Sequence, residues 1–205
     1  MTVVVIANPK GGVGKSTLAT NVAGYFSSQG HSVLLGDADP QQSSRLWLGL
    51  RPPVERRIAP WEVDADLLVK PPKGTTHGVL DTPAGLQGRR LGDVLKFADK
   101  VIVPLQPSVF DIFAVRAFLD ALAKHRRAGK IQVGIVGMRV DARTIAADNL
   151  RAFVENLGLP VLGYVRDTQN YIHLAAGGLS LFDVAPARVE KDLAQWQGIC
   201  EWLDQ

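Results

Sequence analysis

A glycine-rich loop directly after a short apolar stretch is the feature that most constrains how this chain can fold. Residues 2–7 are apolar and mostly β-branched, and residues 16–28 have helical character. Between them the chain reads Lys10-Gly11-Gly12-Val13-Gly14-Lys15-Ser16-Thr17. A loop that leaves a buried strand and opens a helix directs successive backbone N–H groups, and the positive end of the helix dipole, to one place. The sequence therefore predicts a phosphate-binding loop.

The residue types of this loop suit a nucleotide phosphate. Its glycines allow the backbone to wrap closely around an anion. The Lys15 ammonium can reach the outer phosphates, and the Ser16 hydroxyl can ligate Mg²⁺. A glycine-rich turn that binds nothing is the alternative, and the strand-loop-helix context argues against it. We expect all eight residues from Lys10 to Thr17 to contact the nucleotide.

Five further short apolar runs predict the remaining strands. They cover residues 32–35, 78–80, 101–105, 131–136 and 161–165. Helical patterns, notably at 111–127 and 144–157, alternate with them as βαβ units require. The sequence therefore predicts an α/β fold with a mostly parallel central sheet and helices on both faces.

Length and composition suggest one domain, residues 1–205, that needs no disulfide or structural metal. Residues 51–76 are rich in proline and charge, so we expect an irregular excursion there with room for one short helix. Cys200 is the only cysteine, and the histidines share no ligand spacing, so they are expected to be surface or capping residues. No run approaches the length of a membrane span, which favours a soluble, cytoplasmic protein.

Two departures from the strict phosphate-loop pattern are informative. Pro9 stands where the pattern asks for glycine, and a second lysine, Lys10, lies five residues before Lys15. This arrangement resembles the deviant Walker A motif of the ParA/MinD family of P-loop NTPases. In that family the first lysine reaches across a dimer to the partner's nucleotide. The resemblance therefore implies an ATPase that forms a homodimer when ATP is bound.

Two acidic segments extend the resemblance. Residues 34–41 resemble the family's Walker A′ segment, and residues 80–85 resemble Walker B with its switch loop. Carboxylates at strand ends near a phosphate loop can hold Mg²⁺ and orient the attacking water. The resemblance implies that Asp39 positions or activates that water beside the metal, that Asp37 supports Lys15 or the metal shell, and that Asp81 holds Mg²⁺ through water.

Later segments match the family less specifically. Residues 104–108 resemble the loop after the next strand, and residues 166–181 resemble a late helix and turn. Where many relatives carry Asn-Arg after the fifth strand, this chain has Met138 and Arg139, so the usual amide contact to adenine is missing. The choice of ATP over GTP is implied by the resemblance alone. Only nine residues precede the loop, so we expect a protein without an amino-terminal DNA-binding extension, and the resemblance is closest to the small ParA proteins.

Basic residues concentrate in one part of the chain. Residues 116–166 contain nine Lys and Arg against four Asp and Glu, whereas residues 167–205 contain two against six. A surface facing a polyanion is one explanation, and a solvated charged face is the other. The candidate DNA contacts are Lys124, Arg126, Arg127 and Lys130 near a predicted helix end, and Arg139, Arg143 and Arg166 after predicted strands. The helix dipole explains the first group equally well.

One apolar stripe near the carboxyl terminus has helical spacing. It consists of Val189, Leu193, Trp196, Cys200 and Leu203, and it predicts a helix face that packs on the core. Membrane attachment would favour flanking cations, yet residues 188–205 contain two basic and four acidic residues. We therefore expect no membrane partner.

The resemblance implies a complete functional cycle. ATP and Mg²⁺ assemble a dimer, the dimer binds nonspecific DNA, and hydrolysis stimulated by a ParB-like or cargo-adaptor protein releases it. The protein would then be nucleoid-associated in its ATP state and would segregate or position a plasmid or another large cargo. The alternatives are a MinD-like positioning ATPase on a membrane and a small-molecule P-loop ligase. An iron–sulfur carrier would need paired cysteines, which this chain lacks.

Overall fold

A seven-stranded sheet forms the centre of the molecule in the computed structural model. The structure describes residues 1–64, 67–68 and 71–205. Within these ranges, residues 63–64, 67–68 and 109–112 are described by their backbone alone. The strands of the sheet, all paired in parallel, follow the order β3-β2-β6-β1-β7-β8-β9. They are β1 (Thr2–Ile6), β2 (Val33–Asp37), β3 (Ile58–Trp61), β6 (His77–Asp81), β7 (Lys100–Leu105), β8 (Gln132–Met138) and β9 (Val161–Val165). A separate antiparallel pair joins β4 (Val63–Asp64) to β5 (Leu67–Leu68).

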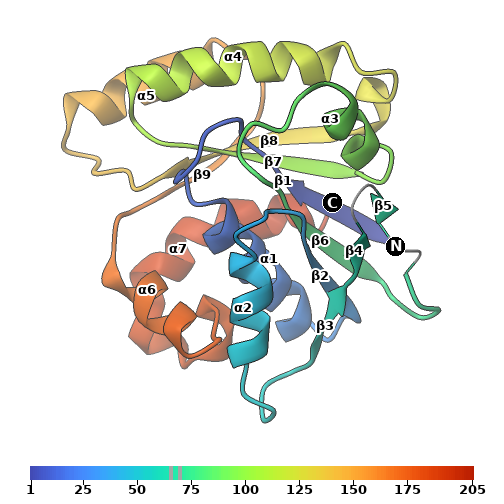
Figure 1. Ribbon diagram of the computed structural model, residues 1–205. Coiled ribbons are helices and arrows are strands. Elements are labelled where there is room, and N and C mark those ends of the chain that lie inside the picture. The colour runs from blue at the N-terminus through green and yellow to red at the C-terminus, as the bar shows by residue number, and fades with distance from the viewer. Residues whose placement is uncertain (65–66, 69–70) are drawn as a thin grey trace.

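Helices cover both faces of the sheet (Figure 1). One layer contains α1 (Lys15–Ser28), α2 (Ser43–Leu50), α6 (Gln169–Ala176) and α7 (Pro186–Leu203). The other contains α3 (Gly88–Leu95), α4 (Val109–Ala123) and α5 (Ile145–Glu155). Two short 3₁₀ turns are η1 (Ala128–Lys130) and η2 (Leu181–Asp183). The predicted α/β fold with a parallel sheet and helices on both faces is confirmed.

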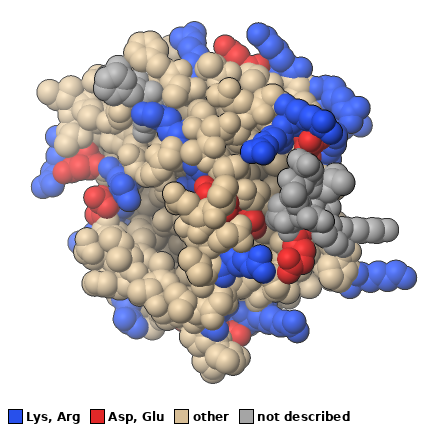
Figure 2. Space-filling view, in the orientation of Figure 1, with Lys and Arg blue, Asp and Glu red and all other residues tan. Residues whose placement is uncertain are grey.

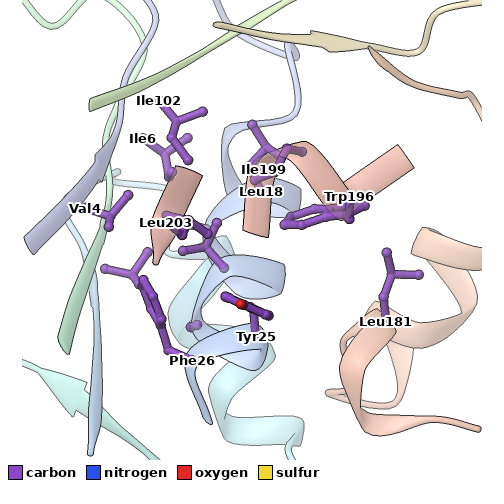
Figure 3. Packing of buried hydrophobic residues seen from close by; sticks show 14 of the residues in the cluster. Val4, Ile6, Leu18, Tyr25, Phe26, Ile102, Leu181, Trp196, Ile199 and Leu203 are labelled. Carbon is purple, nitrogen blue, oxygen red and sulfur yellow. The ribbon is translucent and has the colours of Figure 1, made fainter. Parts of the chain in front are cut away.

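The central strand β1 is buried on both sides, which explains its unbroken apolar sequence. Val4 and Ile6 pack into the cluster formed with α1 and α7, which includes Phe26 and Trp196 (Figure 3). Val3 and Val5 belong to the cluster with α3, α4 and α5. In α7 the side chains of Val189, Trp196 and Leu203 are buried and those of Leu193 and Cys200 pack beside them, so the predicted apolar stripe is a core stripe.

The edge strand β3 was missed by the sequence analysis. The prediction that residues 51–76 form an irregular excursion is wrong for 58–61, which pair in parallel with β2 and place Pro60 opposite Leu35. Proline lacks an N–H group and is tolerated in a sheet mainly on edge strands, which is where β3 lies. The described part of 51–76 contains no helix, and residues 65–66 and 69–70 lie outside the described chain.

Because the strands are parallel, their carboxyl ends meet along one side of the sheet and their amino ends along the other. We call these sides the carboxyl edge and the amino edge. The glycine-rich loop follows β1 at the carboxyl edge, and ligands of open α/β sheets bind outside this edge. None of the helices in the described residues is both long and apolar enough to span a membrane.

Candidate functional site

The glycine-rich loop connects β1 to α1 with a backbone that requires glycine. Gly12 and Gly14 have φ angles of 73° and 93°, a region that side chains disfavour. A Cβ atom on Gly14 would also lie 2.7 Å from the Met138 Cε atom. Gly14 caps the start of α1, which begins at Lys15. The loop therefore presents a helix amino terminus, as predicted for a phosphate site.

Three contacts that the sequence analysis did not assign brace the loop. The buried Asn8 side chain donates to the Pro104 carbonyl (2.6 Å) and accepts from the Lys10 N–H (2.7 Å). The Gln106 amide donates to the Gly12 carbonyl (3.0 Å). An amide residue at the end of a buried strand, as Asn8 is, was the available signal, since a buried amide must find hydrogen-bond partners.

The Lys15 ammonium group lies inside the loop. Its Nζ donates to the Lys10 carbonyl at 2.7 Å, and the side chain is buried. Burial lowers the pKa of Lys15, whereas the charges of Asp81 and Asp39 act in the opposite direction. Lys10 is half-buried on the same loop. A desolvated ammonium next to helical N–H groups favours an anion.

Asp81 lies at the end of β6, between β2 and β1, and is 1% exposed. Its Oδ2 accepts from the Ser44 hydroxyl at 2.7 Å, and its Oδ1 has no hydrogen-bond partner among the described residues. Burial raises the pKa of Asp81 to about 6, against smaller opposing effects of the Ser16 and Ser44 hydroxyls. A buried carboxylate oxygen left without a donor fits a cation or a cation-bound water.

The residues around Asp81 fit a magnesium ion shared with a ligand. Ser16 supplies a hydroxyl, and Asp39 contributes a second charge near Lys15. In the described residues no group of three or more His, Cys, Asp or Glu could hold a metal by itself. Mg²⁺ commonly binds through one or two protein oxygens, with waters and phosphates completing the shell.

Asp37 organises the segment that follows β2. Its two oxygens accept from the N–H groups of Asp39 (3.0 Å), Ser44 (2.8 Å) and Arg45 (3.1 Å). A carboxylate at the amino end of α2 is favoured by the helix dipole. Asp37 thereby fixes the loop that carries Asp39, which is half-buried and itself accepts from the Gln41 N–H (2.9 Å).

Three of the predicted basic residues follow strands at the carboxyl edge. Arg139 is exposed directly after β8, with a φ angle of 53°, whereas Met138 is buried against Gly14. Arg143 pairs with Asp141 at 2.8 Å. Arg166, after β9, pairs at 2.6 Å with Asp192, which is fully buried.

The other predicted basic residues lie at the amino edge, opposite the glycine-rich loop. Helix α4 ends at Ala123, earlier than expected, so Lys124 caps it and the others follow in the turn before β8. Lys124, Arg126 and Lys130 are exposed. The Arg127 guanidinium donates to the carbonyls of Leu95 (3.0 Å) and Lys96, so it ties this turn to α3. The seven candidates therefore form two groups on opposite edges of the sheet.

Comparisons with known proteins identify relatives of this chain. Maintenance of carboxysome distribution protein A of Gloeobacter kilaueensis is 28% identical over 218 residues, which cover 99% of this chain and 94% of that protein. Chromosome-partitioning ATPase Soj of Thermus thermophilus is 28% identical over 184 residues, which cover 73% of this chain and 74% of Soj. The solved structure of the cell division protein MinD from Aquifex aeolicus matches with a TM-score of 0.75 at 18% identity, covering 99% of this chain and 96% of MinD.

The sequence family described as the CobQ/CobB/MinD/ParA nucleotide binding domain matches residues 4–181. This match contains the glycine-rich loop, Asp37, Asp39 and Asp81, the residues that converge at the carboxyl edge. The resemblance inferred from the two lysines and the acidic segments is confirmed, and the chain belongs to the ParA/MinD family of nucleotide-binding ATPases.

Proposed function

We propose that this protein is a ParA-type ATPase that dimerises on ATP and Mg²⁺, binds nonspecific DNA and is released from it by stimulated hydrolysis. The observation that carries the proposal is the unpartnered Oδ1 of buried Asp81 close to the buried Lys15 ammonium. Burying a carboxylate oxygen without a hydrogen-bond donor lowers the stability of the fold. Such an oxygen therefore supports a role for Asp81 in ligand binding.

The nucleotide would bind with its phosphates in the loop 10–17. The loop N–H groups and Lys15 would neutralise the phosphates, and Ser16 and Asp81 would hold Mg²⁺. Asp39 would orient the attacking water, and Met138 and Arg139 would lie beside the base. The bound metal would neutralise part of the phosphate charge. The solved structures of McdA from Cyanothece include a complex with ATP, which supports the choice of nucleotide.

Dimerisation through the carboxyl edge would let Lys10 reach the partner's nucleotide. Exposed apolar side chains on this edge support the proposal: Phe113, Ile145 and Ile172 are 70%, 79% and 59% exposed in the helices that follow β7, β8 and β9. Water contact with these side chains is unfavourable, and a second copy would remove it.

Nucleotide-dependent DNA contact would come from Arg139, Arg143 and Arg166, because they lie at the edge that ATP would bring together. The pair of Arg143 with Asp141 is exposed, so it contributes little energy, and DNA phosphates can compete for the arginine. The amino-edge residues Lys124, Arg126 and Lys130 are remote from the loop. Any DNA contact there would ignore the nucleotide.

The cellular role would be the positioning or segregation of a large cargo. The similarity to a carboxysome distribution protein and to a chromosome-partitioning ATPase supports this role. A ParB-like or cargo-adaptor protein would accelerate hydrolysis, and the ATP state would be associated with the nucleoid. ATP would act as a timer, since hydrolysis removes the interactions that favour the dimer.

The test is DNA binding measured with ATP, with ADP and without nucleotide over a series of salt concentrations. We expect binding only with ATP, and the slope of log affinity against log salt should reflect several phosphate contacts. Lys15→Ala should lower ATP turnover by about 100-fold or more and abolish DNA binding. Lys10→Ala should abolish dimerisation and DNA binding, whereas Asp39→Ala should retain both and lose turnover.

Lys191→Ala is the matched control, since Lys191 is exposed on α7 outside both basic groups. It should behave like the unmodified protein in all three measurements. DNA binding that is equal with ATP, ADP and no nucleotide would disprove the switch. ATP-dependent binding to vesicles instead of DNA would favour the membrane alternative.

A further inference from the structure

A groove at the amino edge has no role in the nucleotide cycle. It encloses about 490 Å³, a volume within the range of about 300–1,000 Å³ that binding pockets occupy. Its walls come from α4 and from the segment after α5, and the beginning of β8 forms its floor. The apolar side chains that line it are those of Leu119, Leu122, Ile131, Val133, Leu157 and Leu159.

The groove exists because β9 is shorter than β8 at the amino edge. Strand β8 begins at Gln132, but its pairing with β9 begins only at Ile135 opposite Val161. Residues 132–134 therefore pair with β7 on one side but with no part of β9 on the other. The chain between α5 and β9 turns at Gly158, whose φ angle is 66°, and leaves Val133 at the bottom of the groove. The recess is thus part of the sheet architecture.

Cations outnumber acids beside this groove, with Arg116, Lys124 and Arg126 against Asp120 and Glu155. Arg116 lies on its α4 wall together with one acid, Asp120. Ala123 and Ala128 also line the groove, so Lys124 and Arg126 lie on the turn that closes one end. Lys130 instead lines a neighbouring hollow that also contains Asp99 and Asp204. These three cations form no ion pair with a described carboxylate. Figure 2 shows Lys and Arg gathered at the upper right, where Figure 1 places α3 and the end of α4.

We propose that the groove binds a short amphipathic segment of a partner protein that is apolar on one face and rich in Asp and Glu around it. The apolar lining would bind the partner's leucine or phenylalanine side chains. The cations Arg116, Lys124 and Arg126 would pair with the partner's carboxylates. Apolar grooves commonly accept such segments, and complementary charge selects the partner. DNA fits less well, because a phosphate backbone has nothing to place in an apolar recess. This proposal is independent of the proposed ATPase function.

The test uses two labelled peptides with the same leucine face and either glutamate or lysine at all other positions. Fluorescence anisotropy with the full chain should show the glutamate peptide binding at least about tenfold more tightly, with affinity that falls as salt rises. Ala123→Glu places a bulky carboxylate in the groove wall and should abolish binding. Ala121→Glu is the matched control, because Ala121 is exposed on the same helix outside the groove.

A charge swap makes the test specific. Lys124→Glu combined with Arg126→Glu should reverse the preference toward the lysine peptide. Equal binding of both peptides, no binding of either, or binding that survives Ala123→Glu would overturn the proposal. A DNA duplex that displaces the glutamate peptide from the unmodified chain and still binds Ala123→Glu would assign the surface to nucleic acid. ATP turnover should be unchanged in Ala123→Glu, which separates this result from the test of the ATPase.

Discussion

Each edge of the sheet contains a buried charged residue, and the two residues differ in how fully their polar atoms are hydrogen-bonded. At the amino edge, Lys100 is buried, and its Nζ donates to the carbonyls of Trp202 (2.6 Å) and Leu203 (2.9 Å) at the end of α7. The ammonium also lies 4.9 Å from the centre of the Trp202 ring. At the carboxyl edge, Asp81 is buried with one oxygen unpartnered. Lys100 therefore satisfies carbonyl groups within the fold, whereas one oxygen of Asp81 has no hydrogen-bond partner among the described residues.

This difference separates structural charge from functional charge. A cation that meets the last carbonyls of a helix satisfies groups that would otherwise lack donors. Removing it should therefore damage stability and leave the site intact. A carboxylate whose charged form is disfavoured by burial should show the opposite behaviour, since its removal relieves a cost in the folded state.

The largest expected effect concerns Asp81. Asp81→Asn keeps the size of the side chain and removes the charge, so we expect ATP turnover at limiting Mg²⁺ to fall by about 100-fold. The free energy of unfolding should stay the same or rise, because no charge is then buried. Turnover titrated with Mg²⁺ and urea unfolding measure the two effects.

Asp167→Asn is the control for that comparison, since Asp167 is an exposed residue just after β9. It should change neither quantity. If Asp81→Asn destabilised the protein strongly while the Mg²⁺ dependence of turnover stayed normal, Asp81 would have a structural role. Both buried charges would then be structural, which would contradict the proposed difference between the two edges.

The next effect is on Lys100. Lys100→Met retains the aliphatic length but leaves the Trp202 and Leu203 carbonyls without their donor, which we expect to cost about 2 kcal/mol of unfolding free energy. ATP turnover by the folded fraction should be unchanged. Lys191→Met, an exposed change on α7, should leave stability within about 0.5 kcal/mol of the original. A stable Lys100→Met variant with lost turnover would contradict the structural role.

Much of the carboxyl edge was predictable because its chemistry is encoded locally. The loop 10–17 and the acidic strand ends are contiguous motifs, and the parallel sheet brings them together automatically. Ser44 could not be found in this way, since its bond to Asp81 joins residues 37 positions apart. The role of Asp37 at the start of α2 was equally hidden, because that helix was not predicted.

The amino edge was harder to predict for a physical reason. Its features depend on where elements end relative to one another: the groove arises from the offset between β8 and β9, and no local pattern records that offset. Strand β3 was also not predicted, because Pro60 and the charged residues beside it do not resemble a strand in sequence. The strand is stabilised by its pairing with β2, which no local pattern records. The basic stretch was visible in the sequence, but only the fold divides it between two edges.

The smallest expected effect tests the histidines at the amino edge, which were expected to be ordinary surface residues. The His77 ring stacks on His31 with centroids 4.0 Å apart and on Phe26 at 4.3 Å. Burial, and then the neighbouring His31, lower the pKa of His77 to about 4. The unfolded chain, with a pKa near 6.5, binds the proton first as pH falls, so stability should decrease between about pH 6.5 and pH 4.

Because His77 is only half-buried, solvent screening reduces this linkage, and we expect a loss of about 1 kcal/mol across that range. His77→Gln should remove that part of the pH dependence, whereas the exposed His173→Gln should keep it. Urea unfolding at pH 7 and at pH 4.5 provides the measurement. Equal pH dependence in all three proteins would show that His77 does not contribute to the pH dependence of stability.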